Sequence, residues 1–328
     1  MQDARRTGTA LLPVAAALAY PFFLKGFHAA ISSGSVGPAA MLLIGAFAMP
    51  LAGFLFAFRL NGCRAQLDLR ARRLAYASIA APPFFVFAGV APGLAGIHVP
   101  DIVIWIAMWL AAGLYVWFAP DTPVAQTFMR PIAGWRVSHG VAAALIACFV
   151  LFHLTNHLFG LEGPQVHKAI MAVGRKVYRA PFIEPVLVAL LLFQIASGAR
   201  LAWRWSALKV DFYRIFQIGS GAYLAAFLLA HMNSAFVSAR TVHHIETDWA
   251  WASGAPTGLL LDAWNIRLLP HYALGAFFIL GHLASGLRVV MLAHGIGATI
   301  ANRFWIAALA ISALVAAAII AGLCGVRI

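Results

Sequence analysis

Long apolar segments alternate with short polar connections along the whole chain. A bilayer core of about 30 Å needs about 20 helical residues, and nine segments approach or exceed that length. Helices satisfy their own backbone hydrogen bonds in lipid, so the pattern predicts an all-α, polytopic transmembrane bundle. We predict spans near residues 9–31, 38–60, 74–95, 101–119, 137–159, 184–205, 213–238, 269–293 and 303–325.

Composition agrees with this class. The chain has 328 residues, of which 63% are hydrophobic and 10% are charged, whereas a soluble domain is about half apolar and a quarter charged. The lipid bilayer is therefore the first expected partner, and we expect a bacterial inner (cytoplasmic) membrane. The three cysteines are isolated and show neither zinc-site spacing nor a disulfide framework.

The net charge of +13 would suggest nucleic-acid binding in a soluble protein. With the N-terminus inside, however, the inner connections hold 15 of the 23 Lys and Arg residues and the outer side holds 8. Cytoplasmic loops are enriched in these residues, so the N-terminus is predicted inside and the C-terminus outside. No basic run is interleaved with aromatic residues, and we expect no nucleic-acid partner.

Three sequence regions are predicted. Residues 1–119 form an N-terminal four-span block of unknown role, in which Pro82 and Pro83 should kink the third span. Residues 120–136 contain several prolines and form a linker. Residues 137–328 form a five-span bundle that carries most of the candidate chemistry.

Polar residues in the second half lie at matched depths. His153 follows Arg136 by 17 residues, and His231 follows Arg214 by 17 residues. In the opposite direction, Gln194-Ile-Ala-Ser-Gly-Ala-Arg200 resembles His282-Leu-Ala-Ser-Gly-Leu-Arg288. If the arginines mark the inner membrane edge, the two levels lie roughly 25 Å and 9 Å above it. The four spans would then form a haem-binding four-helix core.

His153 and His231 are the candidate ligands of a haem iron at the outer level. Two neutral imidazoles at equal depth on parallel spans can approach one flat macrocycle from opposite faces. Hydrogen bonds to neighbouring helices, a metal ion or a proton relay are the alternatives. His157 lies on the same helical face as His153 and could bind a haem propionate or a metal ion.

The inner level is less regular. His282 is a candidate haem ligand, but the repeat places Gln194, a poor iron ligand, where its partner is expected. His139 is a candidate partner that lies closer to the membrane edge. We therefore expect one haem b at the outer level, and a second one only if this inner level also binds haem.

Two further groups could bind ligands. Arg136, Ser138 and His139 could hydrogen-bond a quinone, although a solvated helix start capped by Ser138 would also place them there. Arg179, with the other cations of residues 160–183, could pair with the haem propionates or could belong to a solvated loop. Gly140, Gly198, Gly219, Gly221 and Gly286 would give a macrocycle room near the backbone.

These residues carry a resemblance to a known family. The matching positions are Arg136-x-x-His139-Gly140, His153-Leu-x-x-Asn156-His157, Glu184, Gly219 with His231, and His282 with Gly286. Through them, residues 137–325 resemble the cytochrome b membrane anchor of succinate:quinone oxidoreductase (succinate dehydrogenase) and quinol:fumarate reductase. The resemblance implies outer haem ligands at His153 and His231 and inner ligands at the positions of Gln194 and His282. It also implies quinone as substrate, with flavoprotein and iron–sulfur subunits on the cytoplasmic side.

The sequence therefore predicts a membrane cytochrome b-like protein that passes electrons between quinone and a partner. It has no flavin or iron–sulfur motif, so it would be at most the electron-transfer subunit of an oxidoreductase. The alternative is a haem-free membrane scaffold, assembly partner or small-molecule carrier built on the same bundle.

Overall fold

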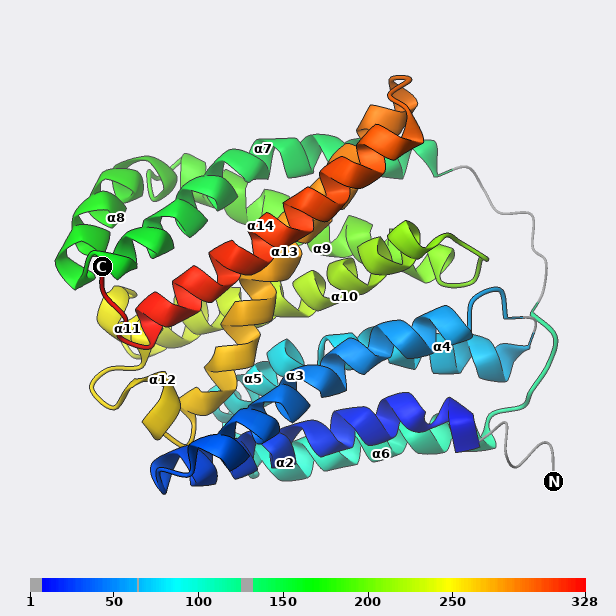
Figure 1. Ribbon diagram of the computed structural model, residues 1–328, viewed down its shortest axis with the longest axis horizontal. Coiled ribbons are helices and arrows are strands. Elements are labelled where there is room, and N and C mark those ends of the chain that lie inside the picture. The colour runs from blue at the N-terminus through cyan, green and yellow to red at the C-terminus, as the bar shows by residue number, and fades with distance from the viewer. Residues whose placement is uncertain (1–7, 64, 125–131) are drawn as a thin grey trace. The chain divides into compact units, whose positions relative to one another are not determined.

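The computed structural model describes residues 8–63, 65–124 and 132–328 (Figure 1). It is 82% helix, and the described residues contain no strand. The predicted all-α class is confirmed. Four arginines of the topology count and one proline of the predicted linker lie outside the described residues, namely Arg5, Arg6, Arg64, Arg130 and Pro131.

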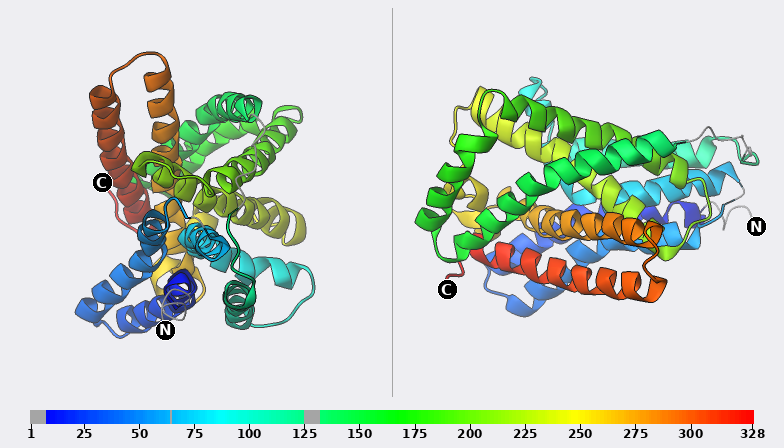
Figure 2. Two further views of the ribbon diagram at one scale, coloured as in Figure 1. Left: turned by 90° about the vertical axis from the view of Figure 1, so that its right-hand side faces the viewer. Right: turned by 90° about the horizontal axis from the view of Figure 1, so that it is seen from above.

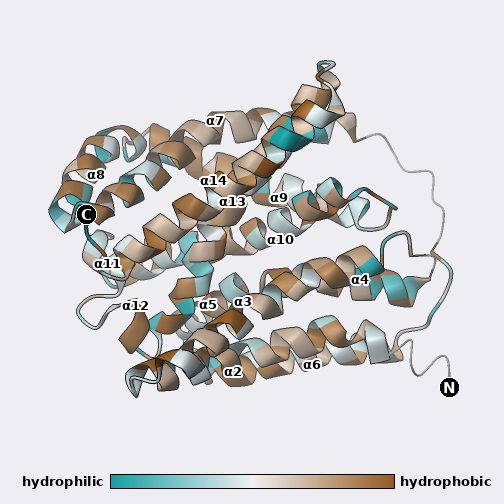
Figure 3. Cartoon of the chain, in the orientation of Figure 1, coloured by the Kyte–Doolittle hydropathy of each residue, from teal (hydrophilic) through white to brown (hydrophobic). Residues whose placement is uncertain are grey.

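Eight helices in the described ranges are long and apolar enough to cross a membrane. Apolar residues cover most of their length (Figure 3). This confirms an integral membrane protein by length and composition, while the inside position of the N-terminus stays a prediction. The eight are α2 (Leu12–Ser32), α3 (Val36–Arg59), α6 (Asp101–Phe118), α7 (Ala133–Leu158) with η1 (Phe159–Leu161), α9 (Ile183–Trp205), α10 (Phe212–Met232) with η2 (Asn233–Val242), η3 (Asn265–Arg267) with α13 (Leu268–Ala293), and α14 (Ala298–Leu323).

The third predicted span is divided in the structure. Helices α4 (Gln66–Ile79) and α5 (Ala81–Leu94) meet at an angle of 70°. Pro82 and Pro83 lie in the first turn of α5, where they cannot donate to the carbonyls of the preceding turn. The helix therefore bends just before the proline pair, and the two halves count as one broken span or as a re-entrant segment.

Contacts divide the chain into two compact units. The first contains the described parts of Met1–Pro131 together with Arg200–Ser234, and the second contains Ile132–Ala199 with Ala235–Ile328. Helix α10 thus makes its contacts in the first unit, with α3, α4 and α5. The predicted sequence division at residues 120–136 stays a prediction.

The first unit has an aromatic core between α2, α5 and α6. Tyr20, Phe85 and Trp105 are buried and lie in mutual ring contact, and the Trp105 indole donates to the Ala17 carbonyl at 3.0 Å. Gly219 of α10 packs against the Phe54 ring, which occupies the place of a side chain. Close helix contacts of this kind need small residues, because lipid supplies no hydrophobic force between helices.

Arg72 of α4 is fully buried and fixes the connection between α9 and α10. Its guanidinium donates to the carbonyls of Ser206 at 2.8 Å and Leu208 at 2.6 Å, and to Asn61 Oδ1 at 2.9 Å. Asn61 also donates to the Val210 carbonyl at 2.7 Å and accepts from its N–H at 3.0 Å. A cation thus satisfies the carbonyls at the end of α9, where the helix dipole favours positive charge.

The second unit contains two helical hairpins. One joins α7 through η1 to α8 (Pro164–Tyr178), and the other joins α13 to α14 (Figure 2). The short helices α11 (Trp249–Ser253) and α12 (Gly258–Leu261) precede α13. Contacts of α7 with α8, α13 and α14 bring its histidines close to residues of the other elements.

Replacement of Arg72 by Met should lower the thermal midpoint of the protein in detergent. Three acceptors would lose charge-assisted hydrogen bonds, each worth about 1.5–3 kcal/mol. Arg70→Met is the matched control, because Arg70 lies on the same helix and is only partly buried, and donates to the carbonyls of Ala119 and Pro120. Equal losses in the two variants would contradict a special role for the buried cation.

Candidate functional site

The predicted outer histidines share one local arrangement. The ring of His153 stacks on Phe149 with centroids 5.6 Å apart, and the ring of His231 stacks on Phe227 at the same 5.6 Å. In each span the phenylalanine precedes the histidine by four residues and follows the arginine by 13 residues. His153 belongs to the second unit and His231 to the first, so their pairing stays a prediction.

The helix that carries His231 changes its winding immediately beyond it. Residues Asn233–Val242 form a π-helix that continues α10. Ten residues of π-helix are unusual, since this form normally appears as a single turn and often near functional sites. The change begins two residues after the histidine.

At the inner level, His139 and not Gln194 lies opposite His282. The two imidazole centroids are 6.4 Å apart, and the ring planes are inclined by 79°. The amide nitrogen of Gln194 donates to the His139 carbonyl at 2.8 Å, and therefore ties α9 to the backbone of α7. Gln194, where the repeat places the partner of His282, thus binds the main chain of His139. The ring that lies opposite His282 is that of His139.

Ser197 determines which nitrogen of His139 carries the proton. Its hydroxyl donates to the Phe193 carbonyl at 2.6 Å, one turn back in α9. Since a hydroxyl has a single proton, its oxygen can only accept from His139 Nδ1, which lies 2.8 Å away. His139 is then the Nδ1–H tautomer in its neutral form, and Nε2 keeps the lone pair that binds a metal.

The second copy of the repeat uses its serine in the same way. Ser285 donates to the Gly281 carbonyl at 2.8 Å and accepts from the Trp305 indole N–H at 2.9 Å. Ser197 and Ser285 occupy equivalent positions in the repeat. Each serine therefore presents an acceptor to a ring N–H of a neighbouring helix, a histidine in one copy and a tryptophan in the other.

The glycines differ in the room that they leave. A side chain at Gly198 would lie 3.3 Å from His139 Cε1, so the glycine lets this ring approach α9. Gly140 and Gly286 have open space in the direction of a side chain. The room at Gly219 is filled by Phe54 and does not serve a ligand.

The residues predicted to bind quinone lie near the start of α7. Helix α7 begins at Ala133, with Ile132 at the N-cap position, so Ser138 lies inside the helix and does not cap it. Arg136 and Ser138 are exposed, whereas His139 is half-buried beside Ser197. Only His139 of these three is brought into the inner site by the contacts of the described residues.

His167, which the sequence analysis missed, extends the group formed by His153 and His157. The ring of His157 lies 4.7 Å from that of His153 and 5.3 Å from that of His167, measured between centroids. His167 is buried in α8 and contacts Trp249, with centroids 4.7 Å apart. Its place in a predicted loop gave no helical spacing that could connect it with His153.

Asn156 fixes His167 inside the α7–α8 hairpin. Its amide nitrogen lies 3.1 Å from His167 Nε2, and both side chains are buried. Burial, together with the nearby cation of Arg175, lowers the pKa of His167 to about 4, against a weaker opposing effect of Asp248. His167 is therefore neutral at physiological pH.

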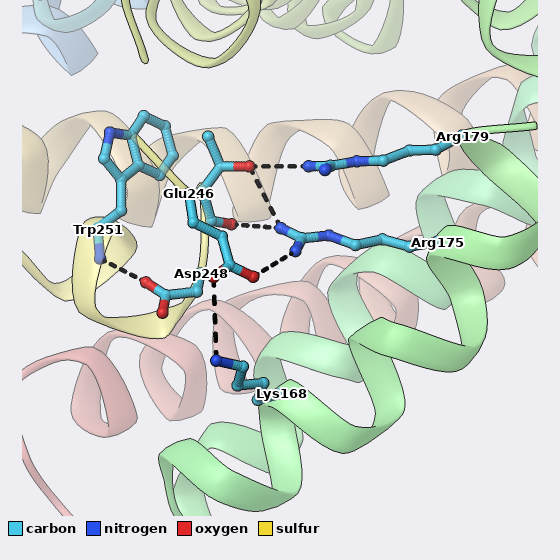
Figure 4. A network of polar contacts seen from close by, with 7 residues as sticks. Lys168, Arg175, Arg179, Glu246, Asp248 and Trp251 are labelled. Atoms are coloured by element: carbon cyan, nitrogen blue, oxygen red, sulfur yellow. Dashed lines mark hydrogen bonds and ion pairs between the residues drawn. The ribbon is translucent and has the colours of Figure 1, made fainter. Parts of the chain in front are cut away.

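The cations predicted to pair with haem propionates contact the loop before α11 (Figure 4). Arg175 forms an ion pair with Glu246 at 3.0 Å and donates to the Thr247 carbonyl at 2.9 Å. Arg179 donates to Thr247 Oγ1 at 2.9 Å. Burial first, and then the like charges of Arg175 and Arg240, lower the pKa of Arg179. The like charges that lower this pKa show that several cations gather here, and an anionic group could neutralise them.

No group of three or more His, Cys, Asp or Glu residues in the described ranges could hold a metal ion. A haem needs only two axial side chains, since the macrocycle supplies the other ligands of its iron. No family model, curated protein or solved structure matches the chain. A functional proposal therefore depends on the geometry and on the residues themselves.

The thermal midpoint should fall as the pH decreases from 6.5 to 4. The unfolded chain binds a proton on His167 near pH 6.5, whereas the folded chain does so only near pH 4. Above pH 6.5 His167 therefore costs the folded protein no stability. Each pH unit below 6.5, down to about pH 4, lowers the free energy of unfolding by up to about 1.4 kcal/mol.

His167→Gln should reduce this pH dependence, because glutamine can still hydrogen-bond Asn156 but does not titrate in this range. Midpoints of wild type, His167→Gln and the control His243→Gln, which alters an exposed histidine, would be measured at each pH. An unchanged pH profile in His167→Gln would show that other groups cause the acid loss.

Proposed function

We propose that this protein is a membrane haem b protein that carries electrons. The observation that supports it best is the pairing of His139 with His282 in the second unit, with centroids 6.4 Å apart. Histidine–metal bonds measure about 2.0–2.1 Å, so two imidazoles that would hold one metal ion between them lie with their ring centres roughly 6 Å apart. The observed spacing fits this value.

Ring contacts without a metal span about 4.5–7 Å, so the spacing needs a second criterion. The tautomer of His139 supplies it. Ser197 holds the proton on Nδ1 and leaves Nε2 as the free donor of a lone pair, which is the usual arrangement of a metal-bound histidine. Gly140 and Gly286, on the same two helices, have no atom within 4 Å in the direction of a side chain.

His153 and His231 are proposed as ligands of a haem at the outer level. Each lies 17 residues after an arginine and stacks on the phenylalanine one turn before it, with ring centroids 5.6 Å apart in both cases, and this common pattern supports the proposal. His157 and Arg179 are proposed to bind the propionates of this haem. The proposed protein thus binds one haem b at each level.

Haem b, when bound, supplies reversible one-electron exchange at its iron. The protein's residues would hold the ligand nitrogens, exclude water through apolar helices and supply positive charge at the ends. Quinone is the proposed electron partner within the membrane, with Arg136, Ser138 and His139 near one end of α7. Flavoprotein and iron–sulfur subunits on the cytoplasmic side are the proposed soluble partners, as the resemblance to cytochrome b anchors implies.

A small-molecule carrier is the second candidate function. The 70° bend between α4 and α5 favours it, because discontinuous helices line the binding sites of many secondary transporters. Tight packing of the bend against Gly53 and Gly219 weighs against it, since a ligand needs space there.

A reduced-minus-oxidised absorbance spectrum of the purified protein, with haem quantified against protein, tests the proposal. Wild type should contain two low-spin haems per chain. His139→Ala and His282→Ala should each lose the same haem, and His153→Ala and His231→Ala should each lose the other. His98→Ala, which alters an exposed histidine outside both pairs, should keep both.

Absence of haem after expression with ample haem supply would leave the carrier as the leading candidate. Full haem content in His139→Ala and His282→Ala would remove the inner site from the proposal and leave the outer site to be judged separately.

Ser197→Ala should weaken haem binding at the inner site by about 10–100-fold, because the variant loses the acceptor that orients His139. Ser285→Ala is the matched control, since it removes the equivalent acceptor from Trp305. Haem retention during titration with a competing apoprotein measures the effect. Equal haem loss in both variants would mean that the serines act through helix stability alone.

A further inference from the structure

Helix α8 lies against α7 along one side. His167, Met171 and Gly174 are buried and recur at helical spacing, so they form one stripe. The Phe152 ring of α7 occupies the place of a side chain at Gly174, and this brings the two helices into close contact. The inward side of α8 is therefore covered by α7 and, at His167, by Trp249 of α11.

A second side of α8 contacts the loop before α11. Lys168 and Arg175 pair with Glu246 at 3.9 and 3.0 Å (Figure 4). Arg175 also donates to the carbonyl of Thr247, two residues before the buried Trp249. Polar contacts thus cover this flank, and its charge is partly neutralised by a carboxylate.

The opposite flank carries exposed apolar side chains. Val173 is 65% exposed and Val177 is 61% exposed. Each lies two residues from Arg175, which at about 100° per residue puts them about 160° around the helix from it. This flank therefore points away from the loop that binds Arg175.

The exposed apolar surface continues beyond the end of α8. Phe182 is 80% exposed, and Ile183 and Val186 at the start of α9 are 40% and 44% exposed. Helix α9 is one of the helices with the length and hydropathy of a membrane span. Lys176, which is also exposed, lies between the two valines in sequence. The apolar flank of α8 is thus followed in sequence by exposed apolar residues at the start of a spanning helix.

We propose that α8 lies in the membrane interface, with Val173 and Val177 inserted among the lipids and Lys176 close to their phosphates. An amphipathic helix with a basic edge has the chemistry that anionic phospholipids bind. Continuity with the surface of α9 favours lipid as the occupant over a protein partner. The bilayer would then hold α8, and with it His167, against His157 of α7.

Site-specific fluorescence tests this position in the full chain. Val177→Cys and Lys168→Cys would be labelled with bimane in a variant whose three natural cysteines are replaced by serine. Each protein would be placed in nanodiscs with or without brominated phosphatidylcholine. The label at 177 should lose most of its fluorescence in brominated lipid, whereas the label at 168, on the loop-contact flank, should be quenched by aqueous iodide instead.

A second measurement tests the basic edge. Replacing part of the lipid with phosphatidylglycerol should increase the quenching of the label at 177 by brominated phosphatidylcholine. Lys176→Gln should remove this increase. Thermal midpoints close to that of the cysteine-free parent would establish that the variants are folded. Iodide quenching of the label at 177, or equal quenching of both labels by brominated lipid, would overturn the proposal. Neither result depends on haem content.

Discussion

Polar groups in the apolar helices of this protein must bond to one another, because water does not reach the hydrocarbon core. Ser197 and Ser285 meet this requirement by donating to a carbonyl one turn back, which leaves their oxygens as acceptors. Gln194 meets it by binding the His139 carbonyl. The geometry of the inner histidine pair follows from these satisfied groups, since together they hold His139 by its ring and its backbone.

The same requirement explains Arg72 in the other unit. The buried guanidinium has no acidic partner among the described residues, and it is tolerated because the Asn61 side chain and two backbone carbonyls accept its hydrogen bonds. Arg72, on helix α4 of the N-terminal block, thereby holds the connection between α9 and α10, which lies far from it in sequence. The position of Arg72 gives this block a structural role that its apolar composition does not reveal.

Hydropathy was sufficient to predict eight spanning helices, because about 20 apolar residues in sequence have few other stable conformations. It did not predict the division of the third span, since the effect of Pro82 and Pro83 depends on how far neighbouring helices let the chain bend. Counting from the flanking arginines put His139 too near the membrane edge to face His282. Counting along a helix axis compares depths only, whereas the ring contact also depends on how α7 packs against α13.

The outer group was only partly predictable for a related reason. His153 and His157 lie on one helical face, and their contact follows from sequence spacing. His167 reaches them only because α7 turns back through η1 into α8, a hairpin that hydropathy does not detect. The phenylalanines before His153 and His231 were visible in the sequence, and their equal spacing is the signal that could have strengthened the prediction for this pair.

The paired serines show how a duplicated helix segment can acquire two uses. Both copies keep an oxygen that receives a ring N–H, yet one receives tryptophan and the other histidine. The tryptophan makes this oxygen a packing contact, whereas the histidine gains a defined tautomer from it. The same serine acceptor can therefore support packing or fix a histidine tautomer, according to the ring that the neighbouring helix presents.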